Sequence, residues 1–234
     1  MELTSFLTPV PLFQGMTREC IAELLPKLQR VTLAKGDVLF RKGAEGGRLF
    51  IVQKGAIKIV LPSPQGGEMI VCIFSEGDFL GEMALLDREP RSADAIAVRD
   101  SELLAISRRD FIDFLRSNET AMETILSTLS RRLRRTDTLL EDKCFLNISE
   151  RLAKKLVELS DAFGVGDEAG EVIDIQIPLT QKELAEMVGA TRESINKELG
   201  ELKKAGLITM RGKTICILDR VALRECVPTG DHRG

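Results

Sequence analysis

Residues 77–93 read Gly77-Asp78-Phe79-Leu80-Gly81-Glu82-Met83-Ala84-Leu85-Leu86-Asp87-Arg88-Glu89-Pro90-Arg91-Ser92-Ala93. This stretch has the chemistry of a pocket for one compact anion that carries a sugar. Gly81 lacks a Cβ atom, so the backbone can approach a ligand closely there. Residues 82–86 can form a short helix, and the first N–H groups of that helix, including those of Met83 and Ala84, point toward an anion.

Three polar side chains complete the expected pocket. The carboxylate of Glu82 can accept hydrogen bonds from hydroxyl groups. Arg91 offers a planar fork of donors to a phosphate, and Ser92 adds a hydroxyl donor beside it. The stretch resembles the phosphate-binding cassette of cyclic-nucleotide-binding domains. The resemblance implies that Glu82 holds the ribose 2′-hydroxyl and that Arg91 and Ser92 hold the cyclic phosphate.

Short β-rich runs surround this stretch, and glycine-containing turns separate them. We expect strands over residues 31–33, 38–40, 49–52, 56–61, 69–74, 93–98 and 102–106, after a short helix over residues 15–30. Closely spaced turns between short strands favour an antiparallel barrel or roll. The segment from Gly36 to Gly55 also resembles the β-roll of cyclic-nucleotide-binding domains.

A helical region is predicted from Arg108 to Phe145. Its apolar positions follow heptad spacing, at Met122, Leu126, Leu129, Leu133, Thr136 and Leu140. This regular seam favours a two-helix dimer interface, with packing on the chain's own domain as the alternative. The arginines at 131, 132, 134 and 135 are interpreted as a solvated face of the helix rather than as a DNA contact.

A second functional signal lies between Leu179 and Ile208. Thr180 and Glu183 form a capping box that predicts a helix through Val188. After a turn at Gly189, Thr191 caps a second helix that ends before Gly206. Two short helices joined by a glycine turn are typical of a helix-turn-helix, and a β-hairpin on both sides of residues 211–213 would form its wing.

The second of these helices carries the chemistry of base recognition. Its N-terminal residues would meet base edges in the major groove, where arginine and lysine pair with guanine and glutamate accepts from cytosine. Arg211 and Lys213 on the wing, and Thr180 and Gln181 at the first helix start, suit phosphates. The candidate base-reading and helix-start residues are Thr191, Arg192, Glu193, Ser194, Asn196 and Lys197.

The composition limits the remaining classes of function. The five cysteines are scattered, and the single histidine, His232, lies in a polar tail, so we expect neither a metal site nor an enzyme. The net charge of −3 gives no global attraction to DNA, so DNA binding depends on a local basic patch. There is no apolar run of about 18 residues and no signal peptide, which predicts a cytoplasmic protein without a membrane partner.

Together these segments resemble the bacterial cyclic-AMP receptor protein / fumarate-nitrate reduction regulator (CRP/FNR) family. The resemblance extends from about Leu12 to Leu223 and rests on the cassette, on Arg131-Arg132-Leu133 and on residues 188–194. It implies a homodimeric transcription regulator that binds a cyclic nucleotide, with cyclic AMP as the first expectation, and then binds palindromic TGTGA-like sites in double-stranded DNA. RNA polymerase is a further partner that the resemblance implies.

Two helix residues bear on the choice of nucleotide. The positions that contact adenine in relatives match Thr136 and Asp137, and Asp137 departs from the family's usual serine or asparagine. A carboxylate accepts hydrogen bonds equally well from adenine N6 or from guanine N1 and N2. Asp137 therefore leaves cyclic GMP open beside cyclic AMP. A cyclic dinucleotide, ligand-independent DNA binding and a regulatory module that does not bind DNA are further alternatives.

The predicted fold is α+β, in four segments. An N-terminal antiparallel β-roll that binds the nucleotide covers residues 1–118, and a dimerisation helix with its hinge covers residues 119–146. A winged helix-turn-helix covers residues 147–227, and a tail covers residues 228–234.

Overall fold

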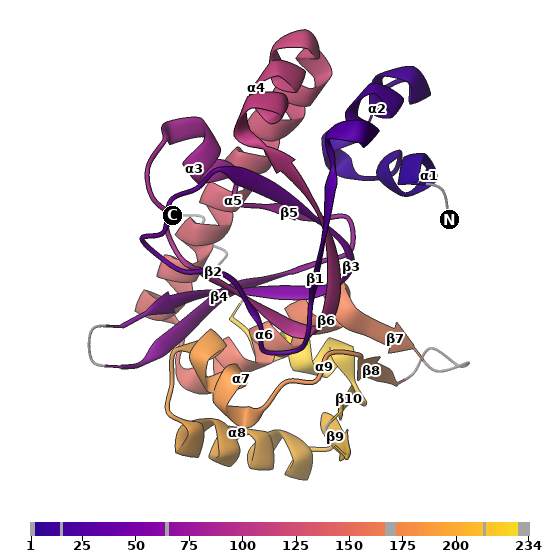
Figure 1. Ribbon diagram of the computed structural model, residues 1–234. Helices are drawn as coiled ribbons and strands as arrows, with labels where there is room; N and C mark the ends of the chain where they lie inside the picture. Colours follow the sequence, from indigo (N-terminus) through magenta and orange to yellow (C-terminus); the bar gives the residue numbers. More distant parts are fainter. Residues whose placement is uncertain (1–2, 15, 64–65, 167–171, 213, 229–234) are drawn as a thin grey trace, which may run out of the picture. The chain divides into compact units, whose positions relative to one another are not determined.

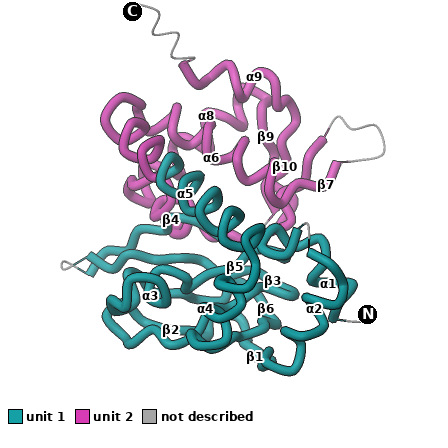
Figure 2. The backbone as a smooth tube through the Cα atoms, turned by 90° about the horizontal axis from the view of Figure 1, so that it is seen from above, with its two compact units in different colours: residues 1–135 teal, residues 136–234 magenta. Residues whose placement is uncertain are grey.

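The structure, a computed structural model, describes residues 3–14, 16–63, 66–166, 172–212 and 214–228. It divides into two compact units, residues 1–135 and 136–234, which Figure 2 shows in two colours. Each unit has its own antiparallel sheet. Figure 1 labels the helices and strands along the chain.

A six-stranded antiparallel sheet forms the body of the first unit. Its main path runs β1-β6-β3-β4, while β2 also pairs with β6 and β5 pairs with β3. The strands are β1 (Gln29–Leu33), β2 (Val38–Phe40), β3 (Arg48–Pro62), β4 (Glu68–Ser75), β5 (Phe79–Leu80) and β6 (Asp94–Ser107). The predicted antiparallel arrangement of the N-terminal region is therefore confirmed.

Two of these strands are longer than the sequence indicates. β3 joins the predicted strands 49–52 and 56–61, and β6 joins the predicted strands 93–98 and 102–106. The expected turn at Gly55 is wrong, because the chain continues there through shifts in register against β6. Gly55 has φ +103°, and Ser101 of β6 fills the space where a Cβ atom would lie. Glycine with positive φ serves bulges as well as turns, so the residue alone does not distinguish them.

The helices of the first unit are α1 (Leu3–Leu7), α2 (Arg18–Leu24), α3 (Glu82–Asp87), α4 (Arg108–Ser117) and the start of α5 (Glu119–Phe145). The predicted helix over residues 15–30 is shorter in the structure, because a 3-10 turn with Pro26 follows Leu24. The predicted helical region 108–145 is two helices, since Asn118 adopts an extended conformation between α4 and α5.

The core of the first unit has two parts. One cluster joins the N-terminal segment to α3, α4 and the first turns of α5 through residues such as Phe13, Leu85, Phe111 and Ile125. The other lies within the sheet, around Phe50. Because Leu85 of α3 belongs to the larger cluster, the segment after Gly81 is held firmly by apolar packing.

The second unit is a helical domain with a four-stranded antiparallel sheet in the order β7-β8-β10-β9. After the end of α5 come α6 (Ile148–Phe163), β7 (Gly164–Gly166), β8 (Ile173–Ile175), α7 (Gln181–Val188), α8 (Arg192–Lys204), β9 (Ile208–Arg211), β10 (Thr214–Ile217) and α9 (Arg220–Glu225). The predicted helix pair and wing hairpin are confirmed, and the strands β7 and β8 extend the wing into a larger sheet. Except for Pro228, the predicted tail lies outside the described residues.

Candidate functional site

The predicted anion pocket begins where β5 passes into α3. Gly81 has φ +86° at the N-cap of α3, and Glu82 is 3% exposed in the first turn. Ala84 and Leu85 are buried and fix this short helix. At its other end, Nε of Arg108 donates to the carbonyl of Leu85 at 2.8 Å. This cap satisfies one of the free carbonyls that every helix end leaves.

Arg91 is a buried cation in this pocket, with 5% of its surface exposed. Its Nη1 donates to the carbonyl of Gly81 at 2.8 Å, and its Nη2 donates to the carbonyl of Arg48 at 2.7 Å. The guanidinium carbon lies 4.3 Å from the ring centre of Phe40, a cation–π distance. Burial lowers the pKa of Arg91, while the nearby charge of Glu82 acts in the opposite direction.

The hydrogen-bonding capacity of Arg91 is incompletely used. Its Nε is buried and has no hydrogen-bond partner among the described residues. Both of its side-chain hydrogen bonds go to carbonyls rather than to a carboxylate. A buried guanidinium of this kind has both the charge and a remaining donor to offer to an anion.

Two glycines make room for the Arg91 guanidinium. A Cβ atom on Gly81 would lie 2.4 Å from Nη1 of Arg91. A Cβ atom on Gly46 would lie 2.2 Å from the Cβ of Ala84 and 3.4 Å from the guanidinium. The loop that contains Gly46 is tied to Arg91 by backbone hydrogen bonds in both directions, through Gly43 and Ala44. Sequence reasoning missed Gly46, because a contact between segments about 40 residues apart leaves no local signal.

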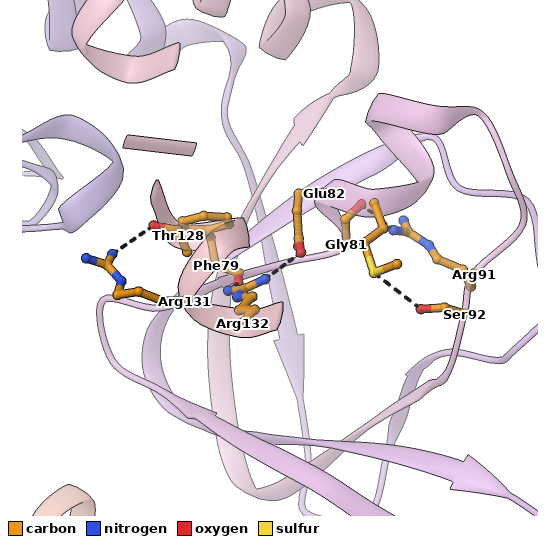
Figure 3. A network of polar contacts seen from close by, with 9 residues as sticks. Phe79, Gly81, Glu82, Arg91, Ser92, Thr128, Arg131 and Arg132 are labelled. Carbon is orange, nitrogen blue, oxygen red and sulfur yellow. Dashed lines mark hydrogen bonds and ion pairs between the residues drawn. The ribbon is translucent and has the colours of Figure 1, made fainter. Parts of the chain in front are cut away.

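Glu82 is paired with Arg132 of α5 (Figure 3). Nη1 of Arg132 lies 2.5 Å from Oε1 of Glu82, and Nη2 donates to the carbonyl of Phe79. The Arg132 guanidinium also lies 4.5 Å and 4.7 Å from the ring centres of Phe74 and Phe79. The sequence interpretation of this arginine as part of a solvated face is wrong. Arg131 does fit that interpretation, since it is exposed and donates to Thr128 of its own helix.

The spacing of residues along α5 indicates that Arg132 faces the first unit. The buried residues Ala121, Ile125 and Thr128 step by four and three along α5, and a further step of four reaches Arg132. This stripe faces the chain's own first unit, and it is distinct from the heptad seam.

The remaining predicted pocket residues are exposed. Ser92 donates from Oγ to Sδ of Met83 at 3.7 Å (Figure 3). Thr136 and Asp137 are exposed on α5. They belong to the second unit, whereas Glu82 and Arg91 belong to the first.

The heptad seam of α5 is largely uncovered. Leu126, Leu133 and Leu140 are 57%, 64% and 60% exposed, and Met122 is 37% exposed. Leu129 is partly buried against the core of the first unit. The helix therefore has one apolar stripe packed on its own domain and a second stripe exposed to solvent.

The helix pair of the second unit is fixed by its caps. The side chain of Thr180 accepts from the N–H of Glu183, and the side chain of Glu183 accepts from the N–H of Thr180, which completes a capping box. Thr191 accepts from the N–H of Ser194. Gly189, with φ +69°, forms the turn between the helices. Each cap satisfies a backbone donor that the helix start would leave free.

The start of α8 presents polar side chains outward. Arg192, Glu193, Asn196 and Lys197 are exposed, whereas Ile195 is buried. Hydrogen bonds to backbone N–H and to Thr191 lower the pKa of Glu193, which keeps it an acceptor. The helix therefore presents donors and an acceptor on its exposed face.

Of the two basic residues predicted on the wing, the structure describes one. Arg211 is exposed and lies 3.4 Å from the carboxylate of Asp174 on β8. The sequence reasoning missed Asp174, because the pairing of β8 with β10 brings it near the hairpin. Gln181, like Thr180, is exposed at the start of α7, and Lys213 lies outside the described residues.

Among the described helices, none combines the length with the apolarity that a membrane span requires.

Comparison with known proteins decides the family. The family model of the cyclic nucleotide-binding domain matches residues 30–118, and that of the Crp-like helix-turn-helix domain matches residues 150–226. The CRP-like cAMP-activated global transcriptional regulator of Mycobacterium tuberculosis is 33% identical over 217 residues, which cover 93% of this chain and 96% of that protein. The Cyclic AMP receptor protein of Thermus thermophilus is 30% identical over 92% of this chain and 95% of that protein.

The chain belongs to the CRP/FNR family of transcription regulators. It is a DNA-binding regulator with a cyclic nucleotide-binding domain and a helix-turn-helix domain, and its relatives are regulators rather than enzymes. Among solved structures, the c-di-GMP responsive regulator CLP of Xanthomonas campestris aligns with a TM-score of 0.75 at 25% identity, over 87% of this chain and 99% of that chain. FixK2 of Bradyrhizobium japonicum, at 16% identity and a TM-score of 0.78, shares the fold.

Proposed function

We propose that this regulator acts in the cytoplasm as a homodimer, binds cyclic AMP in the pocket around Glu82 and Arg91, and in response binds palindromic TGTGA-like DNA. The observation that carries the proposal is the buried Arg91 guanidinium, whose Nε has no partner among the described residues. The names of the two relatives from Mycobacterium tuberculosis and Thermus thermophilus also refer to cyclic AMP.

The chemistry of the pocket residues supports a division of roles between sugar and phosphate. Glu82 would accept from the ribose 2′-hydroxyl, because a carboxylate is an acceptor only. Arg91 and the hydroxyl of Ser92 would donate to the cyclic phosphate, together with the backbone N–H groups of Met83 and Ala84. Gly81 would allow the sugar to approach the backbone.

Thr136 and Asp137 would contact the base, by resemblance to relatives. Asp137 can accept from adenine N6, and it can equally accept from N1 and N2 of guanine. The second candidate is therefore the same regulator with cyclic GMP or a cyclic dinucleotide as its ligand. The solved structure of a c-di-GMP responsive relative adds weight to this alternative.

The exposed seam of α5 supports dimerisation through this helix. Leucines that are more than half exposed and repeat at heptad spacing are typical of a two-stranded coiled coil. In the dimer, two recognition helices would enter successive major grooves about 34 Å apart. A nucleotide that prefers this arrangement shifts the population of dimers toward it.

DNA recognition would divide between α8 and the wing. The residues that read bases would be Arg192, Glu193, Ser194, Asn196 and Lys197, with Thr191 at the helix start. Arg211, Lys213, Thr180 and Gln181 would contact phosphates. RNA polymerase would be the partner on DNA, as the family resemblance implies.

Calorimetric titration with cyclic AMP and then cyclic GMP tests the proposal. We expect one nucleotide to bind, and we expect Arg91→Leu to abolish binding while circular dichroism stays unchanged. Arg116→Leu is the control, because Arg116 is an exposed arginine near the end of α4 that pairs with Asp113 of the same helix. Equal nucleotide affinity in Arg91→Leu and the wild type would refute the pocket. Binding of cyclic GMP or of a cyclic dinucleotide in place of cyclic AMP would establish the second candidate.

A further inference from the structure

Met83 is an exposed methionine inside the predicted ligand pocket. It stands in the first turn of α3 between Glu82 and Ala84, which are both about 3% exposed. The Met83 side chain itself is 50% exposed, more than that of any other methionine in the described parts of the chain. Its neighbours in the helix are thus buried, while half of the surface of Met83 is exposed to solvent.

The Met83 sulfur has one polar contact that matters for ligand binding. Oγ of Ser92 donates to Sδ of Met83 at 3.7 Å, as the dashed line to the yellow sulfur in Figure 3 marks. A thioether is a weak acceptor, so Ser92 can readily turn its hydroxyl to a better acceptor. Under the proposed function, on which this inference rests, that better acceptor is the cyclic phosphate.

We propose that Met83 is a site of reversible oxidation by peroxides and that its oxidation weakens nucleotide binding. A lone pair of Sδ attacks one oxygen of hydrogen peroxide, so that an S–O bond forms and the O–O bond breaks. The sulfur loses two electrons, the peroxide is reduced, and the second oxygen leaves as water with both protons. Methionine sulfoxide reductases reverse this step.

The sulfoxide changes the pocket in two ways. Its oxygen is a strong acceptor, so it holds the Ser92 hydroxyl that would otherwise donate to the phosphate. It also places negative partial charge beside the predicted position of the phosphate. Both effects weaken the binding of an anion, and both leave the buried packing of Ala84 and Leu85 in place. The loss of one hydrogen bond to a charged group predicts about tenfold weaker nucleotide binding.

The test begins with limited hydrogen peroxide treatment of the full chain. Peptide mass spectrometry identifies which methionine is oxidised first, and calorimetry measures cyclic AMP affinity before and after treatment. We expect Met83 to be oxidised first, affinity to fall about tenfold, and a methionine sulfoxide reductase to restore it. Restoration by that enzyme separates methionine from the five cysteines, which it does not repair.

Two variants serve as controls. Met83→Leu removes the oxidisable sulfur at similar volume, so its own affinity for the nucleotide, whatever its value, should not change on peroxide treatment. Met122→Leu removes another exposed methionine and should remain sensitive. Earlier oxidation of a different methionine, or unchanged affinity with Met83 fully oxidised, would overturn the inference. Absence of nucleotide binding by the untreated protein would overturn the proposed function and the predicted effect on affinity, while the peptide map would still decide the site of oxidation.

Discussion

The pocket residues are unusual because two of them are charged and nearly fully buried. Burial of a charge is unfavourable unless hydrogen bonds or an opposite charge compensate it. Arg132 compensates Glu82, whereas carbonyls and an aromatic ring compensate Arg91. The two charges therefore have different surroundings, and Nε of Arg91 is a buried donor without a partner among the described residues.

Substitution of Gly81 tests whether nucleotide binding depends on the position of the Arg91 guanidinium. We expect Gly81→Ala to weaken nucleotide binding in calorimetry, because its Cβ atom would displace the Arg91 guanidinium. Gly77→Ala is the matched control, since Gly77 has almost the same φ, +87°, with no atom within 4 Å of the added Cβ. Both variants should lower the free energy of unfolding by about 1–2 kcal/mol through backbone strain. A similar nucleotide affinity in the two variants would contradict this account.

The pair of Glu82 and Arg132 should matter for stability. We expect Arg132→Met to lower the free energy of unfolding of the first unit by about 1–3 kcal/mol, because the Glu82 carboxylate stays buried without this partner. This estimate is below that for a fully buried pair, since the Arg132 side chain is 27% exposed. Scanning calorimetry of the full chain measures the effect.

Arg131→Met is the control for this prediction, because Arg131 is exposed and donates to Thr128 of its own helix. The double variant Glu82→Gln with Arg132→Met should recover part of the loss, since the Glu82 carboxylate that lacks its partner is then removed as well. Equal destabilisation by the two single arginine variants would show that the ion pair contributes nothing.

At the scale of elements, α5 carries two stripes with different tasks. Ala121, Ile125 and Thr128 bind the helix to the first unit, while Leu126 and Leu133 remain exposed. One helix can serve both purposes because stripes with the same spacing can run side by side on its surface. The exposed stripe is the part that a second chain would cover.

Leu133→Glu tests this interface. We expect the dimer dissociation constant to rise by at least about 100-fold, because each subunit loses a buried leucine and gains a buried carboxylate. Sedimentation velocity over a range of protein concentrations measures the change. Ser127→Glu is the control, since Ser127 is exposed and lies outside the seam. A monomeric wild type, or a dimer unaffected by Leu133→Glu, would rule out this interface.

At the scale of the whole molecule, the proposed dimer must match the geometry of DNA. We expect tight binding, dependent on the nucleotide, when the centres of two TGTGA-like half-sites are one DNA turn apart, about 10 base pairs. Insertion of five base pairs between the half-sites should reduce affinity to that for random DNA, because the second site then faces the opposite side of the duplex. Gel shifts measure both.

The same five base pairs placed outside the palindrome are the control and should leave affinity unchanged. Equal binding to both DNAs would indicate that each helix-turn-helix acts alone, which would contradict the proposed dimer on DNA.

The elements that can be predicted from the sequence are those that local chemistry specifies. The caps at Thr180 and Thr191 and the turn at Gly189 define the helix pair, because a cap depends on residues within one helical turn. Heptad spacing likewise predicts the α5 seam, and glycine-rich turns indicate an antiparallel sheet. These features depend on neighbours in the chain, which the sequence displays directly.

Contacts between residues far apart in the sequence become visible in the folded chain alone. The fold joined the predicted short strands into β3 and β6, it brought Arg132 to Glu82, and it placed Gly46 against Ala84. These contacts link residues that lie about 40 to 50 positions apart, so no local pattern encodes them. Burial then decides the strength of the charge pair, because two charges attract each other more strongly where water is excluded.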